Sequence, residues 1–212
     1  REVSWARRCV QETVFDEDRG FLWLADPTGL YYYNITDRQW YLFSTIGTNG
    51  YGASLLYRNN TLYLIEGGGS SYLYIYDLSN WRTTPDIVDL GYFVGVYGVA
   101  EIADNVIYII TGNNDAYFIS FNTRNYSIEE HEIAPTAYPV GLTYDHDRNR
   151  LWIIGKGGGL FYYDLANNTW KQYSIQLPYT PQGQGNRLEY YSNKLYHFRD
   201  DGTRELWIIK LG

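Results

Sequence analysis

A repeated apolar triplet constrains the fold of this 212-residue chain more than any other feature. The triplet occurs five times at steps of 40, 45, 44 and 44 residues, as Leu22-Trp23-Leu24, Leu62-Tyr63-Leu64, Ile107-Tyr108-Ile109, Leu151-Trp152-Ile153 and Leu195-Tyr196-His197. Two positions before each triplet stands a residue that tolerates a positive backbone φ, namely Gly20, Asn60, Asn105, Asn149 and Asn193. Each triplet is therefore predicted to lie in the second strand of a tight hairpin, and the chain to contain five copies of one unit.

Each unit is predicted to contain four antiparallel strands. A Gly- or Asp-rich break follows each triplet, as in Gly67-Gly68-Gly69 and Gly157-Gly158-Gly159, and a third strand rich in aromatic residues follows the break. The fourth strand is expected near an aromatic residue in units one to four: Trp40, Trp81, Tyr126 and Trp170. Four strands in about 44 residues are typical of a β-propeller blade. The sequence therefore predicts an all-β, five-bladed β-propeller with four-stranded antiparallel blades.

The spacing of the repeats also predicts the blade boundaries. Within one domain spanning residues 1–212, the blades are expected at residues 11–46, 47–90, 91–133, 134–177 and 178–212. The fifth blade ends after its third strand, and residues 1–10, with Trp5 at their centre, have no other partner. We therefore expect residues 1–10 to supply the last strand, because such closure removes exposed strand edges.

Two repeat families resemble parts of this sequence. Gly157-Gly158-Gly159 followed by Tyr162-Tyr163-Asp164 and Trp170 resembles the kelch pattern of paired glycines, Tyr and Trp. The stretch from Leu151 to Tyr173 is similar to propeller repeats of bacterial sensor ectodomains. Both resemblances imply a propeller architecture, but they imply no function, because propellers support ligand binding, scaffolding and hydrolysis alike.

The composition restricts the partners of the chain. A net charge of -7 and a sequence pI near 4.9 disfavour nucleic acid, which requires a basic surface. No apolar run approaches the length of a membrane-spanning helix. With 24 Tyr, no Met and one Cys, the composition is similar to that of virion and surface proteins of thermoacidophilic archaea and their viruses. Tyrosine suits acid because it packs and hydrogen-bonds without a carboxylate charge.

Two features predict an extracellular or virion-surface location. The chain begins with Arg1 and contains no Met, as expected for a product of signal-peptide removal or for a fragment. Four Asn-x-Ser/Thr glycosylation sequons fall in or beside expected hairpin turns, at Asn34, Asn59, Asn125 and Asn167. The alternative is that these residues serve only as turn formers. The single Cys9 allows no internal disulfide and is expected to be buried in a strand.

A repeated carboxylate is the first candidate site. Six residues before the triplet, four of the five units carry an acidic side chain on the expected innermost strand: Asp16, Glu101, Asp145 and Glu189. Side chains that reach the propeller channel would form an acidic column able to hold a cation or polar ligand, since clustered like charges are relieved by a positive guest. The alternative is that polar residues merely solvate the strand ends.

Aromatic residues near the other end of the inner strands form the second candidate site. They lie beside glycines such as Gly50, Gly52 and Gly95, where the channel mouth is expected, and comprise Tyr51, Tyr92, Phe93, Tyr97 and Tyr138. Exposed rings there could stack on sugars or dock a partner protein. The alternative is packing between blades.

Two acidic segments imitate the start of a calcium-binding loop. Asp16-Glu17-Asp18-Arg19-Gly20 and Asp145-His146-Asp147-Arg148-Asn149 both lack the glycine at the sixth position and the closing glutamate of that motif. They are predicted to be hairpins, and no metal site, cofactor or catalytic residue is assigned to them.

The function predicted from these features is structural rather than enzymatic. The chain contains no nucleophile elbow, zinc motif, phosphate loop or cysteine pair. We expect an interaction propeller in an extracellular assembly, most specifically a virion tail or surface component of an archaeal virus, with other proteins as partners. The alternatives are a lectin-like or adhesion propeller that binds glycans, and a glycoside hydrolase-like enzyme using Glu101 and Glu189 as acid and base. Divergence among the loops after the triplets favours one docking site over repeated ones.

Overall fold

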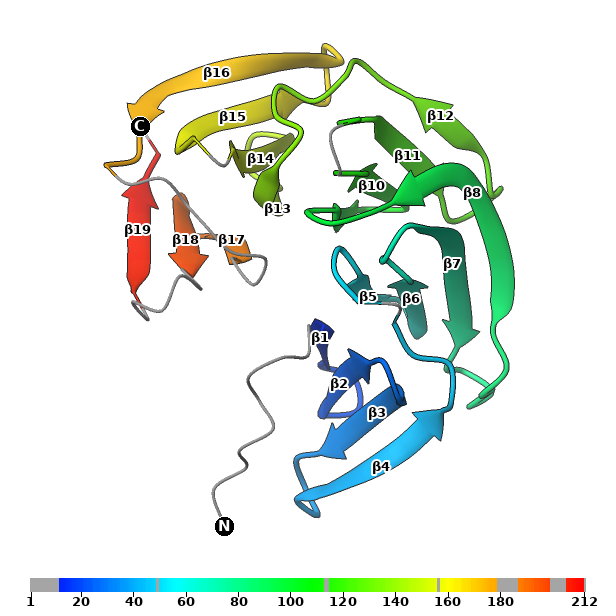
Figure 1. Ribbon diagram of the computed structural model, residues 1–212. Helices are drawn as coiled ribbons and strands as arrows, with labels where there is room; N and C mark the ends of the chain where they lie inside the picture. Colours follow the sequence, from blue (N-terminus) through cyan, green and yellow to red (C-terminus); the bar gives the residue numbers. More distant parts are fainter. Residues whose placement is uncertain are drawn as a thin grey trace. The chain divides into compact units, whose positions relative to one another are not determined.

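The computed structural model describes residues 12–48, 50–112, 115–155, 157–178, 187–198 and 205–211. In these ranges the chain is all-β, and its strands form five antiparallel sheets in which consecutive strands are neighbours (Figure 1). The predicted five-bladed β-propeller fold is confirmed. The chain divides into two compact units, residues 1–95 and 96–212, which are described separately here. The single-domain boundary and the exact blade limits stay predictions.

The first unit contains blades one and two. Blade one comprises β1 (Glu12–Asp16), β2 (Phe21–Asp26), β3 (Gly29–Asn34) and β4 (Gln39–Ser44). Blade two comprises β5 (Ser54–Arg58), β6 (Thr61–Ile65), β7 (Ser70–Asp77) and β8 (Asp86–Val94). The innermost strands β1 and β5 lie side by side. A shared core that includes Trp23, Leu62 and Tyr76 is buried between the two sheets, which explains why their strands do not alternate apolar and polar residues.

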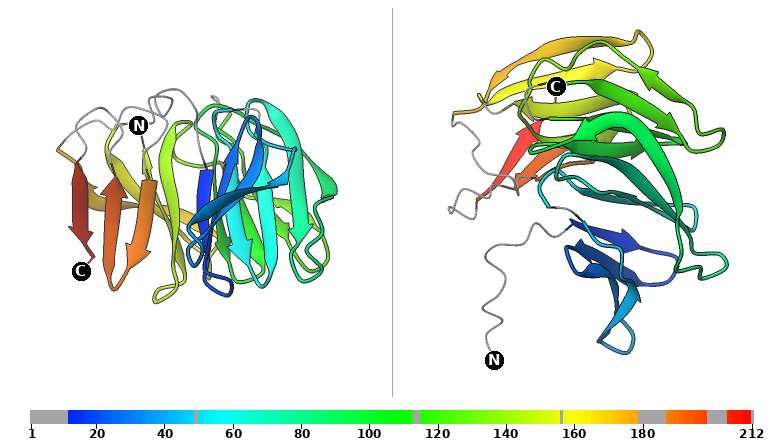
Figure 2. Two further views of the ribbon diagram at one scale, coloured as in Figure 1. Left: turned by 90° about the horizontal axis from the view of Figure 1, so that it is seen from below. Right: turned by 45° about the vertical axis from the view of Figure 1, so that its right-hand side comes forward.

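The second unit contains the other three sheets. Blade three comprises β9 (Val99–Ala103), β10 (Val106–Ile110), β11 (Phe118–Asn122) and β12 (Ile128–Glu130). Blade four comprises β13 (Pro139–Asp145), β14 (Arg150–Gly155), β15 (Gly159–Asp164) and β16 (Thr169–Gln176). Blade five comprises β17 (Arg187–Tyr191), β18 (Lys194–Phe198) and β19 (Leu206–Lys210). Strand β13 lies beside both β9 and β17. One apolar cluster is shared by blades three and four and another by blades four and five. Figure 2 shows the strands of this unit, coloured from green to red, from two further sides.

The hairpin turns adopt the left-handed backbone that the repeat predicted, with one exception. Gly20, Asn60, Asn149 and Asn193 have φ values of 67°, 60°, 53° and 63°. In blade three the prediction of Asn105 is wrong, because Asp104, with φ 53°, takes the left-handed conformation. Ala103 pairs with Val106, so the turn consists of residues 104 and 105 and its first position carries the positive φ.

The ends of the repeats are only partly described. Blade five has three described strands, and the prediction that residues 1–10 complete it concerns residues outside the described ranges, as does Cys9. Trp40 and Trp170 lie in the fourth strands as expected, whereas Trp81 and Tyr126 lie in the turns before β8 and β12, with φ 51° and 62°. In the described segments, no helix is long and apolar enough to traverse a lipid bilayer.

Candidate functional site

Two members of the predicted acidic column are buried structural residues. The side chains of Asp16 and Asp145, at the ends of β1 and β13, are fully buried. Asp16 accepts hydrogen bonds from Trp23 Nε1 at 3.3 Å and Arg19 Nη1 at 3.0 Å. Asp145 accepts the same pair of bonds from Trp152 Nε1 at 3.1 Å and Arg148 Nη1 at 3.2 Å. The arginine supplies the counter-charge that a buried carboxylate requires.

Each of these arginines also reaches the following blade of its own unit. Arg19 Nη2 donates to Asn60 Oδ1 at 2.7 Å and to the Leu78 carbonyl at 3.2 Å. In the second unit, Arg148 Nη2 donates to Asn193 Oδ1 in the corresponding way. The Asp–Arg–Trp arrangement, which we call the hairpin latch, therefore ties β1–β2 to blade two and β13–β14 to blade five.

A tyrosine completes each hairpin latch. The Tyr57 hydroxyl donates to Asp18 Oδ2 at 2.6 Å, and the Tyr190 hydroxyl donates to Asp147 Oδ2. Burial and the bond to Asp18 raise the pKa of Tyr57, whereas the bond from Tyr190 lowers the pKa of Asp147. Since Asp16 and Asp145 are buried and bonded in this way, we remove both from the candidate ligand site.

The other two members of the predicted column, Glu101 and Glu189, lie within the second unit on β9 and β17. Water reaches both residues, because Glu101 is half-buried and Glu189 exposed, but the surrounding protein still desolvates their carboxyls. Burial, opposed by the Ile102 N–H and assisted by the negative charge of Glu189, raises the pKa of Glu101 to about 8. Burial likewise raises the pKa of Glu189. The two carboxyls therefore interact, and the prediction of a cation or ligand there stays untested.

The predicted channel-mouth aromatics fall into two groups. In the first unit, Tyr51 and Phe93 are 47% and 73% exposed, and Tyr92 is partly buried on β8. In the second unit, Tyr97 and Tyr138 pack edge to face with ring centroids 5.3 Å apart. Tyr97 and Tyr138 therefore agree with the alternative that these rings pack inside the protein, whereas the exposed ring of Phe93 is accessible to a ligand.

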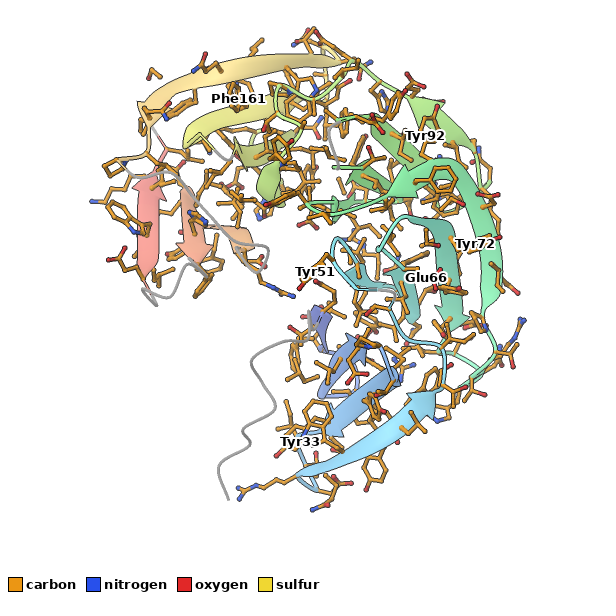
Figure 3. The ribbon with its side chains drawn as sticks, in the orientation of Figure 1. Tyr33, Tyr51, Glu66, Tyr72, Tyr92 and Phe161 are labelled. Carbon is orange, nitrogen blue, oxygen red and sulfur yellow. The ribbon has the colours of Figure 1, made fainter. Side chains whose placement is uncertain are left out.

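The first unit contains an open recess of about 400 Å³ on blade two, and two of its lining residues, Glu66 and Tyr72, are labelled in Figure 3. It lies where the β6–β7 connection meets β8, and the side chains that line it are Glu66, Ser70, Ser71, Tyr72, Tyr74 and Phe93. Glu66 Oε2 accepts hydrogen bonds from Ser70 Oγ at 2.6 Å and from the Tyr74 hydroxyl at 3.2 Å. Among the described residues, no donor reaches the other carboxylate oxygen, Oε1, which is therefore available to a ligand.

The glycines of the β6–β7 connection shape the floor of this recess. Gly67, Gly68 and Gly69 have φ values of 71°, 63° and 86°, a run of left-handed conformations that side chains would strain. A Cβ at Gly67 would also lie 2.4 Å from the Ala53 nitrogen. The amides that follow donate within the protein: Gly68 N to Tyr51 O, Gly69 N to Val94 O and Ser70 N to Gly67 O. The loop is thereby fixed against the neighbouring turn and strand.

Blade two differs from blades one and four at the start of the third strand. By its pairing with the second strand, Tyr72 takes the place of Gly29 in β3 and of Gly159 in β15, and Tyr74 takes the place of Tyr31 and Phe161. A Cβ on Gly159 would lie 2.8 Å from the Phe161 ring, and one on Gly29 would lie 3.0 Å from Leu42 Cδ1. Tyr72, at this glycine position, carries a ring that is 45% exposed. A tyrosine in place of glycine thus adds an exposed ring to the lining of the recess.

A large β-bulge in β8 forms the opposite wall. Ser70 pairs with Val94 and Tyr72 pairs with Asp89. An advance of two residues along β7 is therefore matched by five residues along β8. The corresponding bulge is smaller in blade four, where four steps from Gln172 to Gln176 oppose two. Asp89 accepts hydrogen bonds from Ser71 and from Gly91 N, the latter at 3.0 Å, and these bonds lower the pKa of Asp89. Asp89 is therefore a positioning residue for the strand end that carries Phe93.

Tyr74 keeps its proton in this setting. Burial, with a further contribution from the Glu66 charge, raises the pKa of Tyr74 to about 12. Its hydroxyl consequently stays a donor to Glu66 at neutral pH, while its own oxygen can accept a bond from a ligand. The recess thus combines a carboxylate with hydroxyls that both donate and accept.

The predicted glycosylation sites lie in turns, except Asn34, which ends β3 beside a turn. Asn59, Asn125 and Asn167 are exposed, and Asn34 is half-buried. Three of the side chains also hold their turns: Asn34 Oδ1 accepts from Thr36 N, Asn125 Oδ1 accepts from Ser127 N, and Asn167 Nδ2 donates to Asp164. Their placement suits both glycosylation and the turn-forming alternative.

Sequence reasoning missed most of the recess. It treated Gly67-Gly68-Gly69 only as a break between strands and singled out Phe93 alone among the lining side chains. The signal that could have found the site is the comparison of repeats two and four, because Glu66 and Tyr72 replace Gly155 and Gly159 of the fourth repeat. The loop between the second and third strands is also longer in blade two. Residues 66–72 separate the paired residues Ile65 and Leu73, whereas residues 155–159 separate the corresponding pair, Ile154 and Leu160, in blade four.

Fold and site together define a β-propeller that carries a polar, aromatic-lined recess on its second blade. No known protein family and no curated protein matches the chain. Among solved structures, it is similar to a chain in the crystal structure of the nidogen/laminin complex, with TM-score 0.74 and 13% identity over 96% of this chain and 77% of that one. It is also similar to the structure of YjhT, with TM-score 0.68 and 13% identity over 90% and 72%. Likenesses at this identity show the fold alone.

Proposed function

We propose that this protein is a non-catalytic binding propeller that holds its ligand in the blade-two recess. The observation that carries the proposal is the Glu66 carboxylate, partly open and flanked by the exposed rings of Tyr72 and Phe93. Convergent polar groups beside exposed aromatic rings are typical of ligand sites. Blade two differs from blades one and four at this place, which supports a single specific site.

The composition of the recess supports binding rather than hydrolysis. Glycoside hydrolysis by the usual route requires two carboxyl groups facing one substrate. Glu66 is the one carboxylate among the residues that line this described recess. The pair Glu101 and Glu189 lies in the other unit and belongs to no such lining.

An extracellular interaction partner fits the proposal. Exposed sequons at Asn59, Asn125 and Asn167 support an extracellular setting, and the nidogen/laminin structure is that of a propeller-containing complex. Placement in a virion tail or a surface layer rests on composition alone, so the proposal is not built on it. Intact mass before and after enzymatic deglycosylation of protein secreted by a eukaryotic host tests whether the sequons are used.

A variant-resolved binding screen tests the proposed function. Wild type and Phe93→Ala are applied to a glycan array and to a peptide library, with Ile87→Ala as the matched control because Ile87 is also exposed on β8 but does not line the recess. We expect at least one saturable binder that Phe93→Ala weakens and Ile87→Ala does not. If no binder distinguishes the two variants, the site is wrong; if a bound ligand is converted to product, the non-catalytic assignment is wrong.

A further inference from the structure

The blade-two recess excludes anionic ligands. Phosphate, sulfate and carboxylate groups are usually held by free backbone N–H groups or by basic side chains. The amides of Gly68, Gly69 and Ser70 already donate to chain carbonyls, and none of the lining residues is basic. Glu66 adds a negative charge at the centre of the recess, so an anion would meet repulsion without compensating donors.

The hydroxyl groups of the recess distinguish between the remaining ligand classes. A cation needs acceptors only, whereas a polyhydroxylated molecule donates and accepts at adjacent atoms. The hydroxyls of Ser70 and Tyr74 both donate to Glu66 Oε2, and Tyr72 also lines the recess. Glu66 Oε1 can accept from a ligand hydroxyl, while the serine and tyrosine oxygens can accept from the next one. Two neighbouring hydroxyl groups of a sugar, each of which donates and accepts, fit this arrangement of donors and acceptors.

The aromatic rings supply the apolar contact that such a ligand needs. Tyr72 and Phe93 are 45% and 73% exposed at two sides of the recess, on β7 and on the end of β8. The C–H face of a pyranose ring is apolar and packs on an aromatic ring, whereas its hydroxyls point sideways to polar groups. A quaternary ammonium also binds over aromatic rings, so the titration described below includes one as a competing ligand class.

We propose that the blade-two recess binds a neutral saccharide, with Glu66 accepting ligand hydroxyls and Phe93 and Tyr72 packing against the sugar rings. This inference rests on the proposed function and names its ligand class. The open recess of about 400 Å³ accommodates one to a few sugar rings and leaves the rest of a glycan in solvent.

Titration with defined oligosaccharides tests the inference. The probes are maltotriose, cellotriose, mannotriose, chitotriose and lactose, with 3′-sialyllactose as the anion and tetramethylammonium and a trilysine peptide as cations. We expect saturable binding of at least one neutral probe by calorimetry. Its Kd should rise about tenfold in Phe93→Ala, the effect of losing one aromatic contact, and stay unchanged in Ile87→Ala.

The Glu66→Gln variant separates a saccharide from a cation. Glutamine keeps an acceptor oxygen, so binding of a neutral sugar should weaken by less than about tenfold and respond little to added NaCl. A cation would lose its counter-charge, and its binding would disappear in the variant and in salt. Circular dichroism confirms that each variant is folded.

The outcomes distinguish this inference from the proposed function. If none of the neutral probes binds, or if Phe93→Ala leaves neutral binding unchanged, the saccharide assignment is overturned. If only cations or library peptides bind and Phe93→Ala weakens them, the saccharide assignment fails while the binding function of the recess stands.

Discussion

The raised pKa of Glu101 predicts a pH-dependent stability that one substitution should abolish. Burial beside Glu189 raises this pKa from 4.5 to about 8 in the folded protein. A carboxyl whose pKa is raised on folding favours the folded state most below the unfolded pKa, and this contribution is lost as the pH rises through the folded pKa. Glu101→Gln has no proton to lose, so the wild type should lose stability relative to the variant between about pH 4.5 and pH 8.

The size of this effect follows from the shift. At about 1.4 kcal/mol for each pKa unit, the shift sets an upper limit of about 5 kcal/mol, and water access to the half-buried side chain reduces it to about 1–3 kcal/mol. Urea unfolding followed by circular dichroism at pH 4, 6, 8 and 9 measures the difference. Glu129→Gln, at an exposed carboxylate on β12, controls for removal of one surface charge. An equal gap between wild type and Glu101→Gln at pH 4 and pH 9 would refute the reasoning.

Three other predictions follow from the latch, the recess and the chain ends. Asp145→Asn should lower the free energy of unfolding by about 1–3 kcal/mol, because the Arg148 charge loses its buried partner, and Asp16→Asn should act alike in urea unfolding. Ser70→Ala should remove the hydroxyl that donates to Glu66 Oε2, so titration should show severalfold weaker ligand binding; unchanged binding contradicts our account. Deleting residues 1–10 should lower the thermal midpoint if they complete blade five, and an unchanged midpoint would argue against that closure.

The fold was predictable because it depends on a pattern repeated five times. A single triplet such as Leu62-Tyr63-Leu64 is compatible with many structures, but its recurrence with a turn residue two positions earlier fixes the hairpin and the strand order. The exception at Asp104 shows the limit of this reasoning. Either residue of a two-residue turn can carry the positive φ, and Asp and Asn both tolerate it.

The candidate sites were less predictable because they depend on where side chains point. Asp16 and Glu101 occupy the same repeat position, yet Asp16 is bonded to Trp23 and Arg19, whereas Glu101 is half-buried beside Glu189. The difference was visible in the sequence only as the arginine three residues later and the tryptophan seven residues later. Glu101 lacks both, so its carboxylate has no equivalent partners in the hairpin.

The two hairpin latches and the recess show how one repeat serves both stability and recognition. The latch uses inner-strand hairpins, where Arg19 and Arg148 each bond the next blade, so substitutions there act on the contact between blades. The recess lies on the connection between the second and third strands of blade two and on the end of its outer strand, where Glu66, Ser70 and Phe93 take no part in a latch. Because the two sets share no side chain, Phe93→Ala should change affinity without changing stability, and Asp145→Asn should do the reverse. Blade two can therefore diverge at its loop while the repeat preserves the fold.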